Sequence, residues 1–301
     1  MKILIYGVGG VGGFLGAHLQ KIDLDVSYVA RGKRYSFLKS NGLEVKSALG
    51  NVKLENINVF KSIPEKINFD IMICTVKLYD FDNFISELKD VGIKKTVLLP
   101  FQNGIYSEQK IVEEFGEKKT YGAVAQISSF VNEDQQIIHK GSLASFFVGG
   151  MKRKNHKVLE NFCNRCESLD INIKLKKNIE EKIWEKFIFL SAYSGITTLT
   201  KKTIGQIFES PELKNKFRLA MIETYNLAKN FEVKFNSNPI EYWLEKINKM
   251  PYDMTSSMYI DYVKGKKLEL KWLSGFIVKH SIKFKINCQT HEEIIEGINL
   301  K

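Results

Sequence analysis

The sequence lacks long apolar runs and basic blocks, and each absence argues against a class of protein. No continuous apolar stretch approaches the roughly 18 residues that a membrane helix requires. The formal net charge is +11, but acidic residues are interleaved with the lysines and arginines along the whole chain instead of leaving one basic stripe. We therefore expect neither a membrane protein nor a nucleic-acid-binding protein, and the surplus positive charge favours anionic small molecules as partners.

Cysteine is also scarce, and its spacing is not that of a metal site. Four cysteines are scattered along the chain. Cys163 and Cys166 form a C-x-x-C, but this pair lies in a predicted helix, and no second C-x-x-C or histidine pair accompanies it. The segment that begins at His291 is not H-E-x-x-H, because Ile295 occupies the fifth position. We expect a structural cysteine pair and no metal site.

Residues 1–21 superficially resemble a secretion signal. Their apolar part, however, is a short β-branched run interrupted by glycines, and no small-residue cleavage site follows it. We therefore expect a cytoplasmic protein.

The first half of the chain alternates predicted strands and helices. Apolar strand patterns occupy residues 2–7, 25–30, 68–76 and 95–101, and helical patterns occupy 10–21, 79–91 and 106–115. Such alternation is typical of βαβ units and a parallel sheet. The β-rich stretch 119–150 is predicted to extend or edge that sheet, and a helix near 155–168 and a strand at 171–176 complete the domain.

The second half is helical almost throughout, with glycine, proline and asparagine between the helical segments. The sequence thus predicts an α/β fold, in which a Rossmann-type doubly wound parallel sheet over residues 1–177 is followed by an all-α domain over residues 178–301. The cleft between two such domains is the default ligand site.

A glycine-rich motif follows the first predicted strand. Residues 7–12, GVGGVG, are G-x-G-x-x-G and open a predicted helix, which is the context that a dinucleotide-binding turn requires. Gly7 would make the tight turn, Gly9 would let the backbone approach a pyrophosphate, and Gly12 would let the helix pack close to the strand. We expect all six residues of this turn to contact the cofactor: Gly7, Val8, Gly9, Gly10, Val11 and Gly12.

The end of the second predicted strand indicates which dinucleotide is bound. An NAD enzyme usually carries an acid there to hold the ribose 2′-hydroxyl. This chain has Arg31, Lys33 and Arg34 and no acid, and a guanidinium can hold a 2′-phosphate in a bidentate manner. A solvent-facing basic loop is the alternative, but the pattern favours NADPH or NADP⁺, with Arg31 as the contact.

Two further polar residues follow predicted strands. Lys77 comes just after the strand at 68–76, and Asn103 comes just after the strand at 95–101. Because ligands bind at the carboxyl ends of strands in open α/β sheets, both are candidate cofactor-binding residues. Taken singly, Lys77 is equally well a surface lysine and Asn103-Gly104 a plain turn.

The helical half contains one unusual lysine. Residues 184–194, WEKFIFLSAYS, predict a helix that is apolar on nearly all sides, and Lys186 lies within it. A helix of this kind is normally buried, and lysine is almost never fully buried without a partner. Either the stem is buried and the ammonium group reaches water, or the ammonium group serves a function.

Together these motifs resemble the ketopantoate reductase (2-dehydropantoate 2-reductase) family over essentially the whole chain. The resemblance rests on GVGGVG, VARG with Arg31, TVK with Lys77, QNG with Asn103, WEKF with Lys186, and SSMYIDYVKGKKLEL, which contains Ser257 and Glu269. It implies reduction of a 2-keto acid to a 2-hydroxy acid with NADPH.

The resemblance also implies roles for residues in this chain. Lys186 would be the general acid, because hydride attack on the keto carbon places negative charge on oxygen, and burial makes an ammonium group a better proton donor near neutral pH. Glu269 would partner Lys186, the cofactor ribose or both. Ser257 would bind substrate, and Asn103 would lie between substrate and nicotinamide.

The chain departs from the family where the substrate is recognised. Leu190 and Ser194 occupy the positions four and eight beyond Lys186, which share its helix face and are commonly asparagine in the family. Two further family asparagines correspond to Ile204 and Met254. Leu190 and Ser194 remain candidate substrate-binding residues, but the pocket for the pantoyl end is expected to differ.

Three hypotheses follow. The first is NADPH-dependent reduction of ketopantoate in pantothenate biosynthesis. The second is the same chemistry on a different, more apolar 2-keto acid or ketone. The third is a non-enzymatic NADP(H)-binding regulator. The oligomeric state is left open, a homodimer being one of the arrangements.

Overall fold

The computed structural model describes residues 1–92, 95–152 and 157–300. The chain divides into two compact units. The first contains residues 1–102 and 107–179, and the second contains residues 103–106 and the chain from 180 onward. The short segment 103–106 therefore belongs with the second unit although it lies within the sequence of the first.

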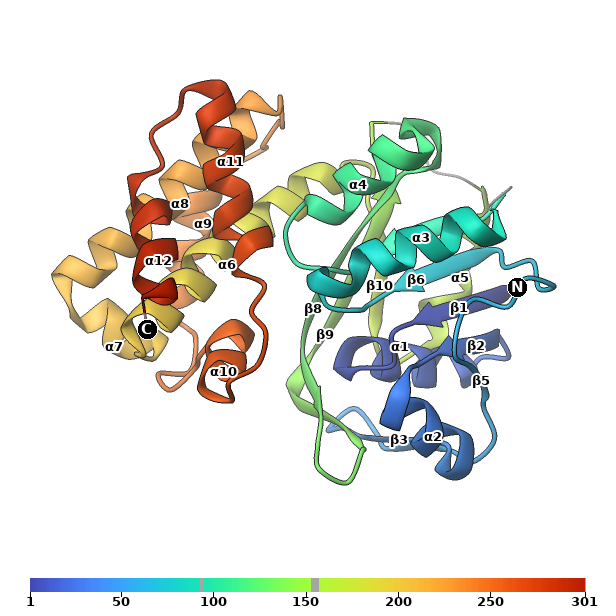
Figure 1. The fold of residues 1–301 in the computed structure, drawn as a ribbon. Coiled ribbons are helices and arrows are strands. Elements are labelled where there is room, and N and C mark those ends of the chain that lie inside the picture. Colours follow the sequence, from blue (N-terminus) through green and yellow to red (C-terminus); the bar gives the residue numbers. More distant parts are fainter. Residues whose placement is uncertain (93–94, 153–156, 301) are drawn as a thin grey trace. The chain divides into compact units, whose positions relative to one another are not determined.

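The first unit is built on a parallel sheet in the order β5-β2-β1-β6-β7 (Figure 1). Its strands are β1 (Lys2–Tyr6), β2 (Asp25–Val29), β5 (Asn58–Phe60), β6 (Ile71–Cys74) and β7 (Val97–Pro100). All residues of β6 and β7 are buried, as expected of parallel strands covered on both faces, which is why their sequences are continuous apolar runs. The four strands predicted from such runs are confirmed, whereas β5 has only three residues and left no pattern.

The described helices of the first unit lie between its strands along the chain. They are α1 (Gly10–Gln20), α2 (Gly32–Asn41), α3 (Phe81–Val91), α4 (Tyr106–Phe115) and, later in the chain, α5 (Lys157–Arg165), with short 3₁₀ turns η1 (Leu78–Asp80), η2 (Glu117–Lys119) and η3 (Cys166–Ser168). The helix predicted near 155–168 is α5, and the prediction for 155 and 156 falls outside the described residues. α1 is buried along most of its length because it contacts both sheets of the unit.

Residues 119–150 do not extend the first sheet as a further strand, and they meet its edge at one point, so only the edge alternative of the prediction holds. They form β8 (Tyr121–Val131) and β9 (Ile137–Gly150), an antiparallel hairpin in a second sheet with β3 (Leu43–Lys46), β4 (Val52–Leu54) and β10 (Asn172–Leu175). A single bridge between Leu98 and Thr120 is the recorded pairing between β7 and the start of this hairpin. Local patterning identifies strands but not their partners, because pairing depends on which edges the tertiary fold brings together.

The described part of the second unit is helical. Its helices are α6 (Ile179–Thr200, which begins at the last residue of the first unit), α7 (Ile204–Glu209), α8 (Pro211–Asn230), α9 (Pro239–Ile247), α10 (Ser257–Val263), α11 (Ser274–Phe284) and α12 (Gln289–Asn299), with a 3₁₀ turn η4 (Leu270–Trp272). Side-chain caps fix several starts: the hydroxyls of Thr203 and Ser210 accept backbone N–H groups of α7 and α8. A Rossmann-type unit and a helical unit confirm the predicted fold class. Among the described residues, no helix has the length and apolar character needed to cross a membrane.

Candidate functional site

The glycine-rich turn after β1 has the shape that a pyrophosphate requires. Gly7 has φ +102°, a conformation that other residues rarely adopt. A Cβ on Gly12 would lie 2.2 Å from both the Gly7 carbonyl and Thr75 Oγ1, so α1 packs tightly against the strand ends. A Cβ on Gly9, in contrast, would meet nothing within 4 Å. Gly9 is also the N-cap of α1 and supplies no side-chain acceptor to its first turn. The open face at Gly9 and the uncapped helix start fit an anionic group.

The turn is also held by the second sheet, which the sequence motif did not reveal. A Cβ on Gly10 would lie 2.3 Å from the carbonyl oxygen of Ser129 in β8, so this glycine is needed for the approach of β8 to α1. Val8 is buried, and Val11 is half-buried and packs against the core of the unit. Of the six predicted residues, Gly10 therefore has a structural role that is independent of any cofactor.

The three basic residues after β2 separate in space. Arg34 turns inward: its Nε donates a hydrogen bond to the Val8 carbonyl at 2.9 Å, and its Nη1 donates to the Gln135 carbonyl in the β8–β9 turn. Burial lowers the pKa of Arg34 to about 10. Lys33 is exposed. Arg34 thus ties the glycine-rich turn to the second sheet, and Arg31 is left as the basic group at the strand end.

Arg31 lies beside an acid that sequence reasoning missed. Its Nη2 donates to the Tyr6 hydroxyl and forms an ion pair with Glu87 of α3. The Tyr6 hydroxyl donates to the same Glu87 oxygen at 2.7 Å. Burial, together with this hydrogen bond, raises the pKa of Tyr6, which therefore remains a neutral donor. Glu87 lies 56 positions from Arg31, so no local pattern could reveal the pair.

The carboxyl ends of β6 and β7 are tied together near Lys77. Gln102 is buried, and its Nε2 donates to the Val76 carbonyl at 3.0 Å and contacts Cys74 Sγ at 3.2 Å. Thr75 Oγ1 donates to the Gly7 carbonyl at 2.5 Å. Lys77 itself is half-buried and is the N-cap residue of η1. The structure therefore places Lys77 at the same edge of the sheet as the glycine-rich turn.

The second unit brings Lys186 and Asn103 together. Lys186 lies on α6 and is half-buried, and its Nζ donates a hydrogen bond to Asn103 Oδ1 at 2.8 Å. The turn that carries Asn103 packs on the same unit, since a Cβ on Gly104 would contact Phe187 and Leu273 at 3.4 and 3.6 Å. Gly104 has φ +86°, which fixes the turn. The ammonium group of the apolar helix thus has a polar partner supplied from 83 positions away.

Glu269 and Ser257 lie in the later part of the second unit. Glu269 is the N-cap residue of η4, and α11 begins after this turn, at Ser274. Glu269 is buried, with 6% of the residue exposed. Ser257 is the exposed first residue of α10. The neighbouring Ser256 is the one that caps this helix and hydrogen-bonds Thr197, with 2.7 Å between the hydroxyl oxygens.

The positions that depart from the family pattern fall into two pairs. Leu190 and Ser194 follow Lys186 at successive turns of α6; Leu190 is half-buried and Ser194 is buried. Ile204 and Met254 are distant in sequence but adjacent in the fold, because the Ile204 amide donates to the Met254 carbonyl at 2.9 Å. Ile204 is buried and Met254 is 37% exposed.

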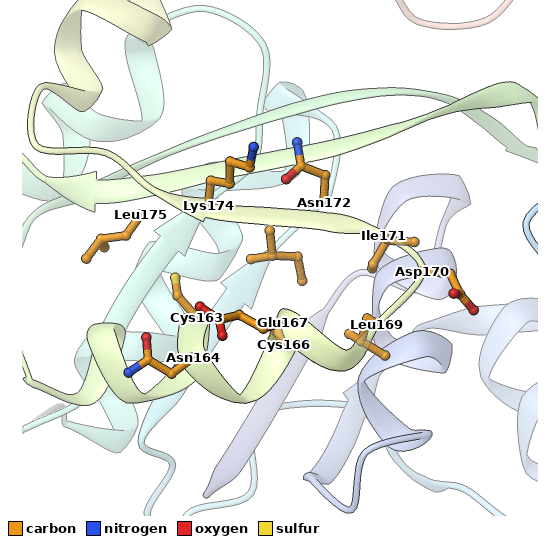
Figure 2. Close-up of a pocket in the computed structure, with 11 residues that line it drawn as sticks. Cys163, Asn164, Cys166, Glu167, Leu169, Asp170, Ile171, Asn172, Lys174 and Leu175 are labelled. Carbon is orange, nitrogen blue, oxygen red and sulfur yellow. The ribbon is translucent and has the colours of Figure 1, made fainter.

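A groove elsewhere in the first unit carries none of the predicted site residues. It has a volume of about 590 Å³ and is lined by residues 163, 164, 166, 167 and 169–175, which are close together in the sequence. Figure 2 shows its side chains coming from α5, the following turn and β10. Cys163 and Cys166 lie there as free, buried thiols, and burial raises the pKa of each to about 12. Among the described residues, no group of three or more His, Cys, Asp or Glu side chains is placed to hold a metal ion.

Comparison with known proteins identifies the family. The family model described as "Ketopantoate reductase PanE/ApbA" matches residues 3–153, and its C-terminal counterpart matches residues 178–301. The chain belongs to the ketopantoate reductase family. It is therefore an oxidoreductase acting on a keto group, of a family that uses NAD(P).

Individual relatives of this ketopantoate reductase family member are distant. An uncharacterized oxidoreductase of Bacillus subtilis is 25% identical over 300 residues, which cover all of this chain and 98% of the relative. The 2-dehydropantoate 2-reductase of Archaeoglobus fulgidus is 26% identical and covers 98% of this chain and 95% of the relative. The crystal structure of 2-dehydropantoate 2-reductase from Geobacter metallireducens matches with a TM-score of 0.90 at 21% identity, covering 100% and 99% of the two chains. The fold is therefore shared along its whole length.

Proposed function

We propose that this protein is a 2-dehydropantoate 2-reductase that uses NADPH to reduce the keto group of ketopantoate, giving pantoate. The observation that carries the proposal is the hydrogen bond between Lys186 and Asn103 in a chain of this family. The amide of Asn103 holds the ammonium group of Lys186 where the polar start of α6 gives way to its apolar stretch, and this arrangement suits an acid catalyst.

Reduction of a 2-keto acid requires a hydride at carbon and a proton at oxygen. The cofactor supplies the hydride when it is bound. Lys186 donates a proton from Nζ to the oxygen as negative charge develops there, and it recovers a proton from solvent after the product leaves. Asn103 accepts a hydrogen bond from Nζ and so directs the remaining N–H groups. Glu269 is the buried carboxylate that we assign to Lys186 or to the cofactor ribose.

Residues of the first unit bind the cofactor in this proposal. The uncapped start of α1 and the open face of Gly9 receive the pyrophosphate. Arg31 binds the 2′-phosphate, and Lys77 binds toward the nicotinamide end. The Arg31 side chain suits this role because 47% of it is exposed and can be reached by a ligand.

The substrate pocket is the part of the site in which this chain departs from the family pattern. Ser257, Leu190 and Ser194 are the proposed contacts in this chain. A second candidate substrate is a more apolar 2-keto acid or ketone, favoured because Leu190, Ile204 and Met254 are apolar residues at positions of family asparagines. The third candidate, an NADP(H)-binding regulator without turnover, predicts binding but no reaction.

The proposed physiological setting is pantothenate biosynthesis in the cytoplasm, with the protein as a homodimer. Light scattering on the purified protein measures the assembly directly. A molar mass of twice the chain mass is expected.

The deciding experiment follows NADPH consumption by its absorbance, with ketopantoate and a panel of other 2-keto acids of graded polarity as substrates. The highest kcat/KM is expected for ketopantoate. A higher kcat/KM for an apolar 2-keto acid would contradict ketopantoate as the substrate but would support the proposed reduction. Tight binding of NADPH with no turnover of any substrate would contradict the enzymatic proposal and support the regulator.

A further inference from the structure

The ion pair at the end of β2 bears on the choice between NADPH and NADH. Sequence patterning found a base and no acid at this strand end, and the fold supplies the acid from α3. Figure 1 shows α3 lying along the same sheet that carries β1 and β2. Arg31 and Glu87 therefore lie together where a Rossmann-type fold places the adenosine ribose.

Glu87 is held firmly in this position. One carboxylate oxygen accepts hydrogen bonds from Tyr6 and Arg31, and the other accepts the backbone N–H of Ile63 at 3.1 Å. Its side chain is 21% exposed, so solvent screens it less than a free surface carboxylate. Three donors from three separate segments keep the negative charge at the strand end.

Arg31 is engaged on one side only. Its guanidinium donates through Nη2 to Tyr6 and Glu87 and stacks over the Tyr6 ring, and the Asp80 carboxylate adds a further negative charge nearby without a hydrogen bond. Within the described part of the chain, Nε and Nη1 donate no hydrogen bond, and the side chain is 47% exposed. The guanidinium can therefore still receive a phosphate while its charge is offset by Glu87.

The two charges have opposite effects on the two cofactors. A guanidinium attracts a 2′-phosphate, whereas a carboxylate repels it and suits a free ribose hydroxyl. We propose that Glu87 sets the cofactor preference of this protein by offsetting the charge of Arg31 at the 2′ position, so that NADH is accepted beside NADPH. This inference rests on the proposed function only in requiring a dinucleotide at the glycine-rich turn.

The Glu87→Gln substitution removes the charge and keeps most of the side chain's contacts. Glutamine keeps one oxygen that accepts hydrogen bonds from Tyr6 and Arg31, and it loses the second acceptor, which bonds the Ile63 N–H. A matched control is Glu114→Gln, because Glu114 also pairs with a residue of α3, Lys89, and with Lys110, and its loss changes the net charge equally. Thermal melting of both variants checks that they fold.

The measurement is the dissociation constant of NADPH and of NADH, by titration calorimetry, for the wild-type protein and both variants. In Glu87→Gln the NADPH constant is expected to fall about tenfold, as for removal of one charge near a phosphate in solvent-exposed surroundings, while the NADH constant changes little. The gain should shrink as salt is added, which a purely structural role of Glu87 would not produce. Glu114→Gln should leave the ratio of the two constants unchanged.

Two outcomes overturn the inference, and they are distinguishable. If both cofactors bind and the ratio in Glu87→Gln is unchanged or moves toward NADH, Glu87 only positions Arg31, and the proposed function stands. If the wild-type protein binds neither dinucleotide, the proposed function fails together with this inference.

Discussion

The Nζ of Lys186 lies 2.8 Å from Oδ1 of Asn103, and this hydrogen bond joins the long helix α6 to a turn 83 positions earlier in the chain. The turn belongs to the same compact unit as the helix although the sequence on either side of it belongs to the other unit. The contact gives the ammonium group a fixed direction. It also makes each of the two residues a specific target for mutation.

Replacing Lys186 with alanine is expected to lower kcat by about 10²–10⁴-fold, because the developing alkoxide loses its proton donor. The dissociation constant of NADPH should change little. Steady-state kinetics and calorimetry measure the two quantities separately. Lys182→Ala is the matched control, since Lys182 lies one turn earlier on α6 and pairs with Glu185 instead. Equal losses in both variants would contradict the assigned role of Lys186.

Asn103→Ala should lower kcat by about 10- to 100-fold, because Lys186 then loses the acceptor that orients it. In the Lys186→Ala background the same change should have almost no further effect on kcat, since the two residues act as one unit. Kinetics of the two single variants and the double variant test this. If the fold-losses in kcat of the two single variants multiply in the double variant, Asn103 acts independently of Lys186.

Two glycines of the same turn should respond in opposite ways to alanine. Gly9→Ala meets open space and should leave Tm nearly unchanged while weakening NADPH binding. Gly12→Ala places a Cβ 2.2 Å from the Gly7 carbonyl, and overpacking of this kind costs about 1–3 kcal/mol, so Tm should fall by several degrees. Calorimetric melting and binding measurements distinguish them. Unaltered NADPH affinity in a well-folded Gly9→Ala would contradict a pyrophosphate at this turn.

The buried His291 should make stability depend on pH. Burial lowers its pKa to about 4, and its ring nitrogens contact Thr224, Ser274 and the Ala220 carbonyl. Between pH 6.5 and 4 the unfolded chain binds a proton that the folded chain does not, so the free energy of unfolding rises with pH across this window. The contribution is about 3 kcal/mol, complete above pH 6.5 and lost toward pH 4.

Denaturant unfolding at a series of pH values measures this slope, with His291→Gln as the comparison. The variant should be less stable at neutral pH but should show a smaller loss on acidification. Glu223, whose pKa is raised by burial, acts in the opposite direction, because its protonation favours the folded state as the pH falls. Identical slopes in wild type and His291→Gln would exclude the histidine as the source.

Features carried by adjacent residues were predictable. Continuous β-branched runs indicate buried parallel strands because both of their faces are covered, and β1, β2, β6 and β7 follow from this alone. The glycine-rich turn was equally readable, since the conformation of Gly7 and the close packing of Gly12 are local requirements. A lysine in an apolar helix was visible as an anomaly that needed a partner.

Features that depend on residues far apart in sequence were not predictable. The assignment of β8 and β9 to a second sheet depends on which edges meet, and Gly10 is constrained by Ser129 only after that sheet has formed. The partner of Lys186 and the acid beside Arg31 come from 83 and 56 positions away. By itself, the sequence determined the strands, the turn and the residues capable of chemistry, because these follow from neighbouring residues. Only the tertiary structure decided which charges and amides face one another, because long-range packing sets those distances.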